Sequence, residues 1–213
     1  IKLFALILIV AFVASCGKKE KEKDFNKLSN QEKILLLDAK IKKDPKNAEL
    51  YYQRGEVFYK MENTKEALFN AEKAIELDKK QVKYYTFEAD VLFARGEITL
   101  SFNALEEALK VDKKSTEAYL KIAELSMYMK DYDKSMDNIK KALEIDDMNP
   151  NAYYLRGYIM KETGDTARAV IDYKKAIELK SNYEQPFEEL GLIYANRGDG
   201  LAVDYLNSTI NIN

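Results

Sequence analysis

Apolar and aromatic residues recur along most of this chain with a period of 34 residues. Four alanines mark successive steps of the period: Ala74, Ala108, Ala142 and Ala176. Five aromatic residues mark a second phase of it: Tyr51, Tyr85, Tyr119, Tyr153 and Phe187. A fixed period of this length indicates stacked supersecondary units, each of which covers the apolar face of its neighbour.

The spacing inside one period is helical. Tyr51 precedes Gly55 by four residues, which is about one helical turn, so the two lie on the same face of a first helix. Ala67 and Ala74 lie about two turns apart along a second helix, where side chains of a neighbouring helix can fit between them. Each period therefore predicts a hairpin of two helices, with Tyr51 and its equivalents at core positions.

Glycines also follow the period, in two phases. The first phase places a small residue where a second helix crosses closely: Gly55, Gly157 and Gly191. The second phase falls where the first helix must stop, which is the usual place for a left-handed residue: Gly96, Gly164 and Gly198. Where that glycine is missing, Glu62 precedes Asn63 and Lys130 precedes Asp131, and Asn and Asp also tolerate tight turns.

Three segments carry a resemblance to a known repeat. The sequences Tyr153–Gly157 (YYLRG), Lys161–Asp165 (KETGD) and Ala176–Leu179 (AIEL) resemble the tetratricopeptide repeat, a pair of antiparallel helices. The resemblance implies an all-α fold, a right-handed superhelical solenoid of helix-turn-helix units. We expect five such units: 48–81, 82–115, 116–149, 150–183 and 184–213, the last one residue short and either an exposed edge or truncated. Ser101 and Ser135 replace an alanine of the second helix, a change that we expect the packing to accept.

A capping box precedes the first unit. Ser29 is followed three residues later by Glu32, a pairing that opens helices. We expect a helix from there to about Lys43, within a segment 29–47 that covers the open end of the stack.

The N-terminus predicts a lipoprotein signal. Residues Leu3–Ala14 are uncharged and follow Lys2, a stretch too short to span a membrane but typical of the core of a secretory signal. The junction Val13-Ala14-Ser15-Cys16 resembles the bacterial lipoprotein box. We therefore expect a signal peptide at 1–15 and a lipid on Cys16, the single cysteine of the chain. The alternative is an ordinary signal peptide with a chance cysteine.

The residues after Cys16 predict a tether. Residues Lys18–Asp24 are all charged, so the segment 16–28 is expected to stay hydrated. Gly17 is not the aspartate that retains lipoproteins in the inner membrane of well-studied Gram-negative bacteria. By that resemblance the expected location is the bacterial cell envelope, anchored by lipid to the outer membrane.

Composition excludes several chemistries. The chain has no histidine and one cysteine, so imidazole catalysis, the usual histidine-containing metal sites and an internal disulfide are excluded. The formal net charge of −2 disfavours a general nucleic-acid binder. We expect no metal, no cofactor and no nucleic acid.

The resemblance also implies a binding groove. In this repeat class the second, fifth, ninth, twelfth and thirteenth positions of each unit line a concave face. The groove residues that we single out are Tyr52, Glu56, Tyr59, Asp90, Phe93, Glu124, Tyr128, Tyr154 and Tyr158. Thr86 and Leu120 occupy the same fifth position as Tyr52 and Tyr154. Acids outnumber lysines among the groove positions, which favours a basic or neutral peptide or protein segment. The plainer interpretation of each aromatic is simple core packing.

The expected function is a membrane-anchored, non-enzymatic scaffold that binds a protein segment in an assembly or trafficking complex. One alternative is a structural lipoprotein that self-assembles through its uncapped last helix. A second alternative is a hydrolase of peptidoglycan or another glycan that uses two carboxylates.

Overall fold

The computed structural model describes residues 25–212, which are helical apart from the turns between helices. The predicted signal peptide, Cys16 and the charged run of the tether lie outside the described residues. The helices are η1 (Phe25–Lys27), α1 (Asn30–Lys43), α2 (Ala48–Lys60), α3 (Thr64–Leu77), α4 (Val82–Ala94), α5 (Ile98–Val111), α6 (Thr116–Tyr128), α7 (Tyr132–Ile145), α8 (Pro150–Glu162), α9 (Thr166–Leu179), α10 (Glu184–Asn196) and α11 (Leu201–Ile212). None of these helices is both long and apolar enough to cross a bilayer.

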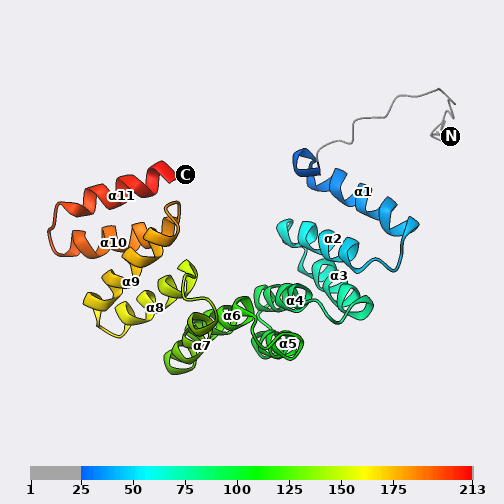
Figure 1. The fold of residues 1–213 in the computed structure, drawn as a ribbon. Coiled ribbons are helices and arrows are strands. Elements are labelled where there is room, and N and C mark those ends of the chain that lie inside the picture. The colour runs from blue at the N-terminus through cyan, green and yellow to red at the C-terminus, as the bar shows by residue number, and fades with distance from the viewer. Residues whose placement is uncertain (1–24, 213) are drawn as a thin grey trace.

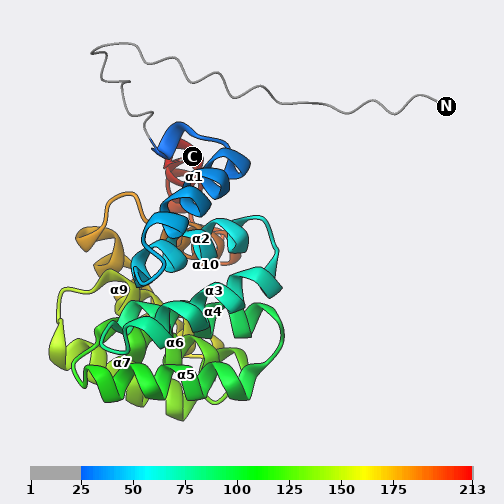
Figure 2. The same cartoon turned by 90° about the vertical axis from the view of Figure 1, so that its right-hand side faces the viewer.

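The helices form an arc of stacked hairpins (Figure 1). We call α2, α4, α6, α8 and α10 the first helices and α3, α5, α7, α9 and α11 the second helices. Each first helix packs most extensively against the second helix of its own hairpin and then against the preceding second helix. Along the middle of the arc, α4 and α6 lie on the inner side and α5 and α7 on the outer side (Figure 1). The perpendicular view places both ends of the arc at the top, with α1 in front of α11 (Figure 2). The all-α solenoid predicted from the period is confirmed.

The turns inside the hairpins use left-handed residues, as predicted. Gly96, Gly164 and Gly198 have φ of 77°, 93° and 67°. In the two hairpins without that glycine, Glu62 and Lys130 adopt φ of 59° and 60°. The following residues, Asn63 and Asp131, then cap the second helices through their side chains. The cap that follows offsets part of the strain of a left-handed non-glycine residue.

The periodic tyrosines fix the turns between hairpins. Each hydroxyl donates a hydrogen bond to the backbone carbonyl six residues earlier, at 2.9–3.3 Å: Tyr51 to Pro45, Tyr85 to Lys79, Tyr119 to Lys113 and Tyr153 to Asp147. Tyr51 is buried, but the other three are half-buried. The prediction of core positions is therefore correct for Tyr51 and incomplete for the other three tyrosines. Their rings cover the turn, and their hydroxyls satisfy a backbone carbonyl of that turn.

Small residues allow the helices to cross closely. A Cβ added to Gly55 would lie 2.8 Å from the Phe87 ring, and one added to Gly157 would lie 2.9 Å from the Tyr173 ring. Ser101 and Ser135, which replace the alanine, fit equally well. The Ser101 hydroxyl donates to the carbonyl of Ala89 at 2.8 Å, and Ser135 repeats this with Ala123 at 2.8 Å. The side chains that replace alanine are therefore both packed and hydrogen-bonded.

The N-terminal end of the arc begins with the predicted capping box. The Glu32 amide donates to the Ser29 hydroxyl, and the Ser29 amide donates to the Glu32 carboxylate at 3.0 Å. Upstream of it, Phe25 of η1 packs with Ile34, Leu37 and Val57. The segment predicted as a hydrated tether through Leu28 is therefore shorter than expected, because Phe25 buries apolar surface against α1 and α2.

Candidate binding groove

The nine predicted groove residues all lie on first helices, from α2 to α8. Five of them line one hollow, which we call the central hollow: Asp90, Phe93, Glu124, Tyr128 and Tyr158. It has a volume of about 430 Å³ and lies between α4, α6 and α8. Tyr52, Glu56, Tyr59 and Asp90 line a smaller hollow of about 230 Å³ between α2 and α4, which we call the N-terminal hollow. Tyr154 lines neither.

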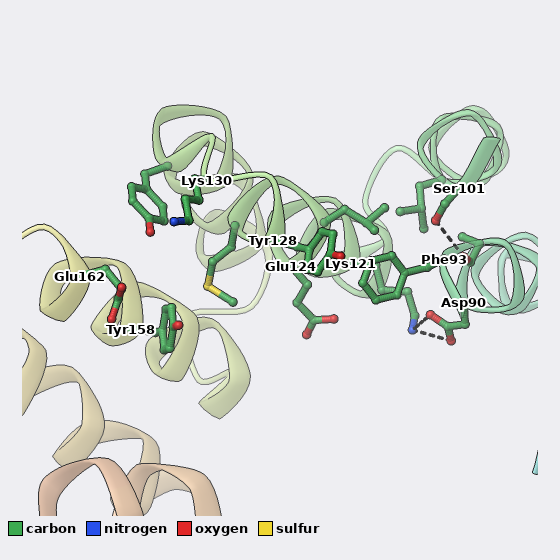
Figure 3. A pocket seen from close by; sticks show the side chains of 14 residues that line it. Asp90, Phe93, Ser101, Lys121, Glu124, Tyr128, Lys130, Tyr158 and Glu162 are labelled. Atoms are coloured by element: carbon green, nitrogen blue, oxygen red, sulfur yellow. Dashed lines mark hydrogen bonds and ion pairs between the residues drawn. The ribbon is translucent and has the colours of Figure 1, made fainter. Parts of the chain in front are cut away.

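Aromatic and thioether side chains form the apolar wall of the central hollow. The rings of Phe93 and Tyr128 meet edge to face with centroids 5.1 Å apart. Phe93 is 37% exposed and Tyr128 is 65% exposed, so both offer ring surface to solvent. Met127 also lines the hollow, and Tyr158 of α8 faces it from the opposite side (Figure 3). The exposed aromatic surface makes this wall a candidate contact site.

One ion pair on the α4 side of the hollow escaped the sequence analysis. Lys121 Nζ lies 2.6 and 2.7 Å from the two carboxylate oxygens of Asp90 (Figure 3). Burial raises the pKa of Asp90, and the lysine opposes that shift. Lys121 occupies the sixth position of its unit, which the family pattern does not assign to the groove. The pair neutralises one acid that had been counted toward the excess.

Two acids of the central hollow have weaker partners. Glu124 accepts a hydrogen bond from the neutral amide of Asn151 at 3.1 Å. Glu162 lies 3.8 Å from Lys161, but Lys161 is closer to Glu189, at 2.7 Å. Within the central hollow, Glu124 and Glu162 are therefore less fully neutralised than Asp90.

The N-terminal hollow is filled by its own side chains. The Tyr52 hydroxyl donates to Glu56 at 2.9 Å, and the Tyr52 ring lies 5.4 Å from the ring of Phe87. Burial first, and then the Glu56 hydrogen bond, raises the pKa of Tyr52 well above its ordinary range. Lys83 Nζ lies 4.9 Å from the centre of the same ring and 2.6 Å from Glu49. These contacts engage Tyr52, Glu56 and Lys83 within the hollow's own surroundings.

Three residues at the fifth position of their units lie mostly in packed interfaces: Thr86, Leu120 and Tyr154. Thr86 is 1% exposed, and Leu120 is 5% exposed and packs with residues of α7 and α8. Tyr154 is half-buried, with ring centroids 6.0 Å from Tyr173 and 5.4 Å from Tyr183. Burial raises the pKa of Tyr154 to about 12. Their side chains pack in the interfaces between successive hairpins, although Thr86 also lines the N-terminal hollow and Leu120 lines another hollow beside the start of α8. The assignment of Tyr154 to the groove stays a prediction.

A third hollow, of about 670 Å³, lies between α7, α8 and α9. Four of its charged groups form two pairs: Arg156 binds Asp172 through two hydrogen bonds of 2.7 Å, and Lys140 lies 4.0 Å from Glu144. This internal pairing leaves little charge for a ligand. Within residues 25–212, no cluster of three or more His, Cys, Asp or Glu side chains is placed to bind a metal ion.

Comparison with known proteins identifies the repeat. The tetratricopeptide repeat pattern matches residues 48–81, 116–147 and 150–183. The chain therefore contains tetratricopeptide repeats and folds as a tetratricopeptide solenoid. No curated protein sequence matches it significantly.

Solved structures share this fold at low sequence identity. MamA is 23% identical, with a TM-score of 0.59 over 71% of this chain and 89% of that one. YrrB, described as a tetratricopeptide protein with an unusual peptide-binding site, is 17% identical, with a TM-score of 0.55 over 83% and 91%. The pilF protein of Pseudomonas aeruginosa is 20% identical, with a TM-score of 0.70 over 78% and 77%. These likenesses establish the fold.

Proposed function

We propose that this protein is a non-enzymatic scaffold that binds a peptide or protein segment along the inner side of its arc. The observation that carries the proposal is the central hollow, where five predicted groove residues from three first helices meet. Exposed aromatic rings with few rotatable bonds are efficient contact residues. The peptide-binding site named for YrrB supports the same use of this fold.

The experiment is capture of the partner by the native protein. A variant with both Tyr128→Ala and Tyr158→Ala removes two walls of the central hollow. Phe69→Ala is the matched control, because Phe69 is 56% exposed on α3 and lines neither hollow of the groove. Crosslinking in native cells, followed by mass spectrometry, is expected to recover a partner with wild type and with the control but not with the double variant. Equal recovery by all three proteins would contradict groove binding.

We further propose that the scaffold is anchored to the bacterial outer membrane through a lipid on Cys16, within an assembly or trafficking complex. The support is the junction Val13-Ala14-Ser15-Cys16 in the sequence. Two or more acyl chains anchor a protein stably. Cells fed an alkyne fatty acid are expected to label wild type and not Cys16→Ser, and the variant is expected to leave the membrane fraction. A labelled Cys16→Ser protein would contradict the proposal.

The last helix favours self-assembly as a second candidate function. Three apolar residues of α11 are 61%, 36% and 71% exposed: Val203, Leu206 and Ile210. The corresponding residues of α5 pack in a cluster with residues of the next first helix, α6: Phe102, Leu105 and Leu109. A second copy of the chain could cover the exposed face of α11. Light scattering in detergent is expected to give a dimer mass for wild type and a monomer mass for Ile210→Glu. A monomer mass for wild type would contradict this candidate.

A further inference from the structure

The charges around the central hollow are not balanced evenly. Asp90 and Lys121 neutralise each other on the α4 side, and Lys161 is engaged by Glu189 at 2.7 Å. Glu124 has only a neutral amide as its partner at 3.1 Å, and Glu162 has the more distant contact to Lys161 at 3.8 Å. The hollow therefore keeps one carboxylate, Glu124, whose hydrogen-bond partner is neutral, and a second, Glu162, whose lysine is shared with Glu189.

Each of these carboxylates lies next to an aromatic residue of the hollow. Glu124 lies on α6 with Tyr128, one helical turn away, and Glu162 lies on α8 with Tyr158, also one turn away. Glu124 and Tyr128 therefore share one side of the hollow, while Tyr158 and Glu162 share the other (Figure 3). Lys130, the remaining cation of the lining, stands at the turn after α6, away from the Glu124 carboxylate (Figure 3). A bound segment would meet an apolar surface flanked by negative charge.

The volume of the hollow and the flexibility of its wall determine the size of the side chain that fits. About 430 Å³ lies within the range of small ligand pockets, so the hollow holds a large side chain and part of its backbone. Met127 is unbranched and adaptable, and the exposed rings of Phe93 and Tyr128 can pack on either an aliphatic or an aromatic group.

We propose that the central hollow binds a linear protein segment through one large apolar side chain seated against Phe93, Met127 and Tyr128, with a neighbouring lysine or arginine held by Glu124. This inference rests on the proposed function and deepens it by stating the chemistry of the partner. Charge complementarity selects this occupant, because an acidic segment would face two carboxylates with one lysine to offset them.

The test measures fluorescence anisotropy of labelled twelve-residue peptides with the full chain in detergent. One peptide carries Phe and Lys three residues apart in a Gly/Ser background, the second carries Phe and Glu, and the third carries Ala and Lys. The first is expected to bind at least about tenfold more tightly than either of the others. Equal binding of all three peptides, or tighter binding of the acidic one, would overturn the proposal.

Two variants divide the effect between the two parts of the site. Tyr128→Ala is expected to weaken the Phe and Lys peptide by about tenfold or more. Glu124→Gln is expected to abolish the preference for Lys over Glu while keeping the preference for Phe over Ala. Glu106→Gln is the matched control, because Glu106 is exposed on α5 and lines neither hollow of the groove, and it is expected to change neither preference. A Glu124→Gln variant that keeps the full Lys preference would overturn the role of the carboxylate.

The outcomes separate this inference from the general proposal. If native cells yield a partner that depends on Tyr128 and Tyr158, while the peptides show no preference for Phe and Lys, groove binding stands and the stated chemistry is wrong. If the groove variant captures the same partner as wild type, groove binding itself fails. Tyr128 is 65% exposed, so its replacement leaves the fold intact, which far-UV circular dichroism of each variant checks.

Discussion

At the scale of single residues, Glu88 on α4 is the clearest case of an unfavourable environment. Burial, and then the charge of Glu72, raise the pKa of Glu88 from 4.5 to about 7. In the first hairpin the equivalent residue is Arg54, which lies 2.6 Å from Asp38 and donates to Asn70 at 2.9 Å. The same position of the repeat therefore stabilises the charge of Arg54 in the first unit and destabilises the charge of Glu88 in the second.

We predict that Glu88→Gln stabilises the protein near neutral pH. The folded state binds the Glu88 proton more tightly than the unfolded chain, so stability is lost as the pH rises from about 4.5 to about 7. At pH 8 the variant should exceed wild type by about 1–2 kcal/mol, with allowance for the part of the carboxylate that water reaches. Urea unfolding at pH 4 and pH 8 measures this. An equal difference in the free energy of unfolding between variant and wild type at both pH values would contradict a raised pKa of Glu88.

Gly157 gives a second prediction at this scale. An alanine Cβ would lie 2.9 Å from the Tyr173 ring, which is fully buried, and 3.3 Å from the Ala169 carbonyl. Gly157→Ala should therefore destabilise the protein by about 1–3 kcal/mol, although alanine favours the helix. Gly200→Ala is the control, because nothing lies within 4 Å of its added Cβ. If urea unfolding shows that the control is the less stable variant, crowding at Gly157 does not determine the stability of the protein.

At the scale of helices, boundaries follow local chemistry that the sequence displays. The capping box at Ser29 and the left-handed glycines are present as expected. Asn63 and Asp131 also cap the second helices, a role that was not predicted for them. The end of the tether differs, because Phe25 packs on the cluster that includes Ile34 and Val57. A run of charged residues indicates a hydrated segment. A single aromatic residue after that run is nevertheless enough to pack the chain against the folded helices.

We predict that Ser29→Ala loosens α1. Removal of the cap leaves backbone amides unsatisfied and should cost about 0.5–2 kcal/mol. Since α1 covers α2 through Leu37 and Val57, hydrogen exchange measured by mass spectrometry should rise in residues 30–43 and around Val57, near the end of α2. Helix α9, capped separately by Asp165, serves as the internal control and should not change. Unchanged hydrogen exchange in α1 would mean that packing, and not the cap, stabilises the N-terminal end of this helix.

At the scale of the whole molecule, stability is shared between neighbouring hairpins. Helix α6 packs against α4, α5, α7 and α8, whereas α11 packs chiefly against α10. In a stack of this kind each unit is stabilised by its neighbours, so the ends open more easily than the middle.

We predict that hydrogen-exchange protection is highest in α4–α7 and falls toward α11. The full chain in detergent, followed by mass spectrometry over time, should show the residues of α11 exchanging at least about tenfold faster than those of α6. A partner that occupies the central hollow should raise protection of α4, α6 and α8 first. Uniform protection from α1 to α11 would indicate a single cooperative unit.

The sequence by itself determined the hairpins, their turns and the capping box, because these depend on residues within one or two turns of one another. It also identified five of the residues that line the central hollow. Only the tertiary structure decided that Asp90 pairs with Lys121, that Thr86 and Leu120 are buried and that Glu124 has a neutral hydrogen-bond partner. These features join residues about one repeat apart, where the partner of a side chain depends on how one hairpin rests on the next.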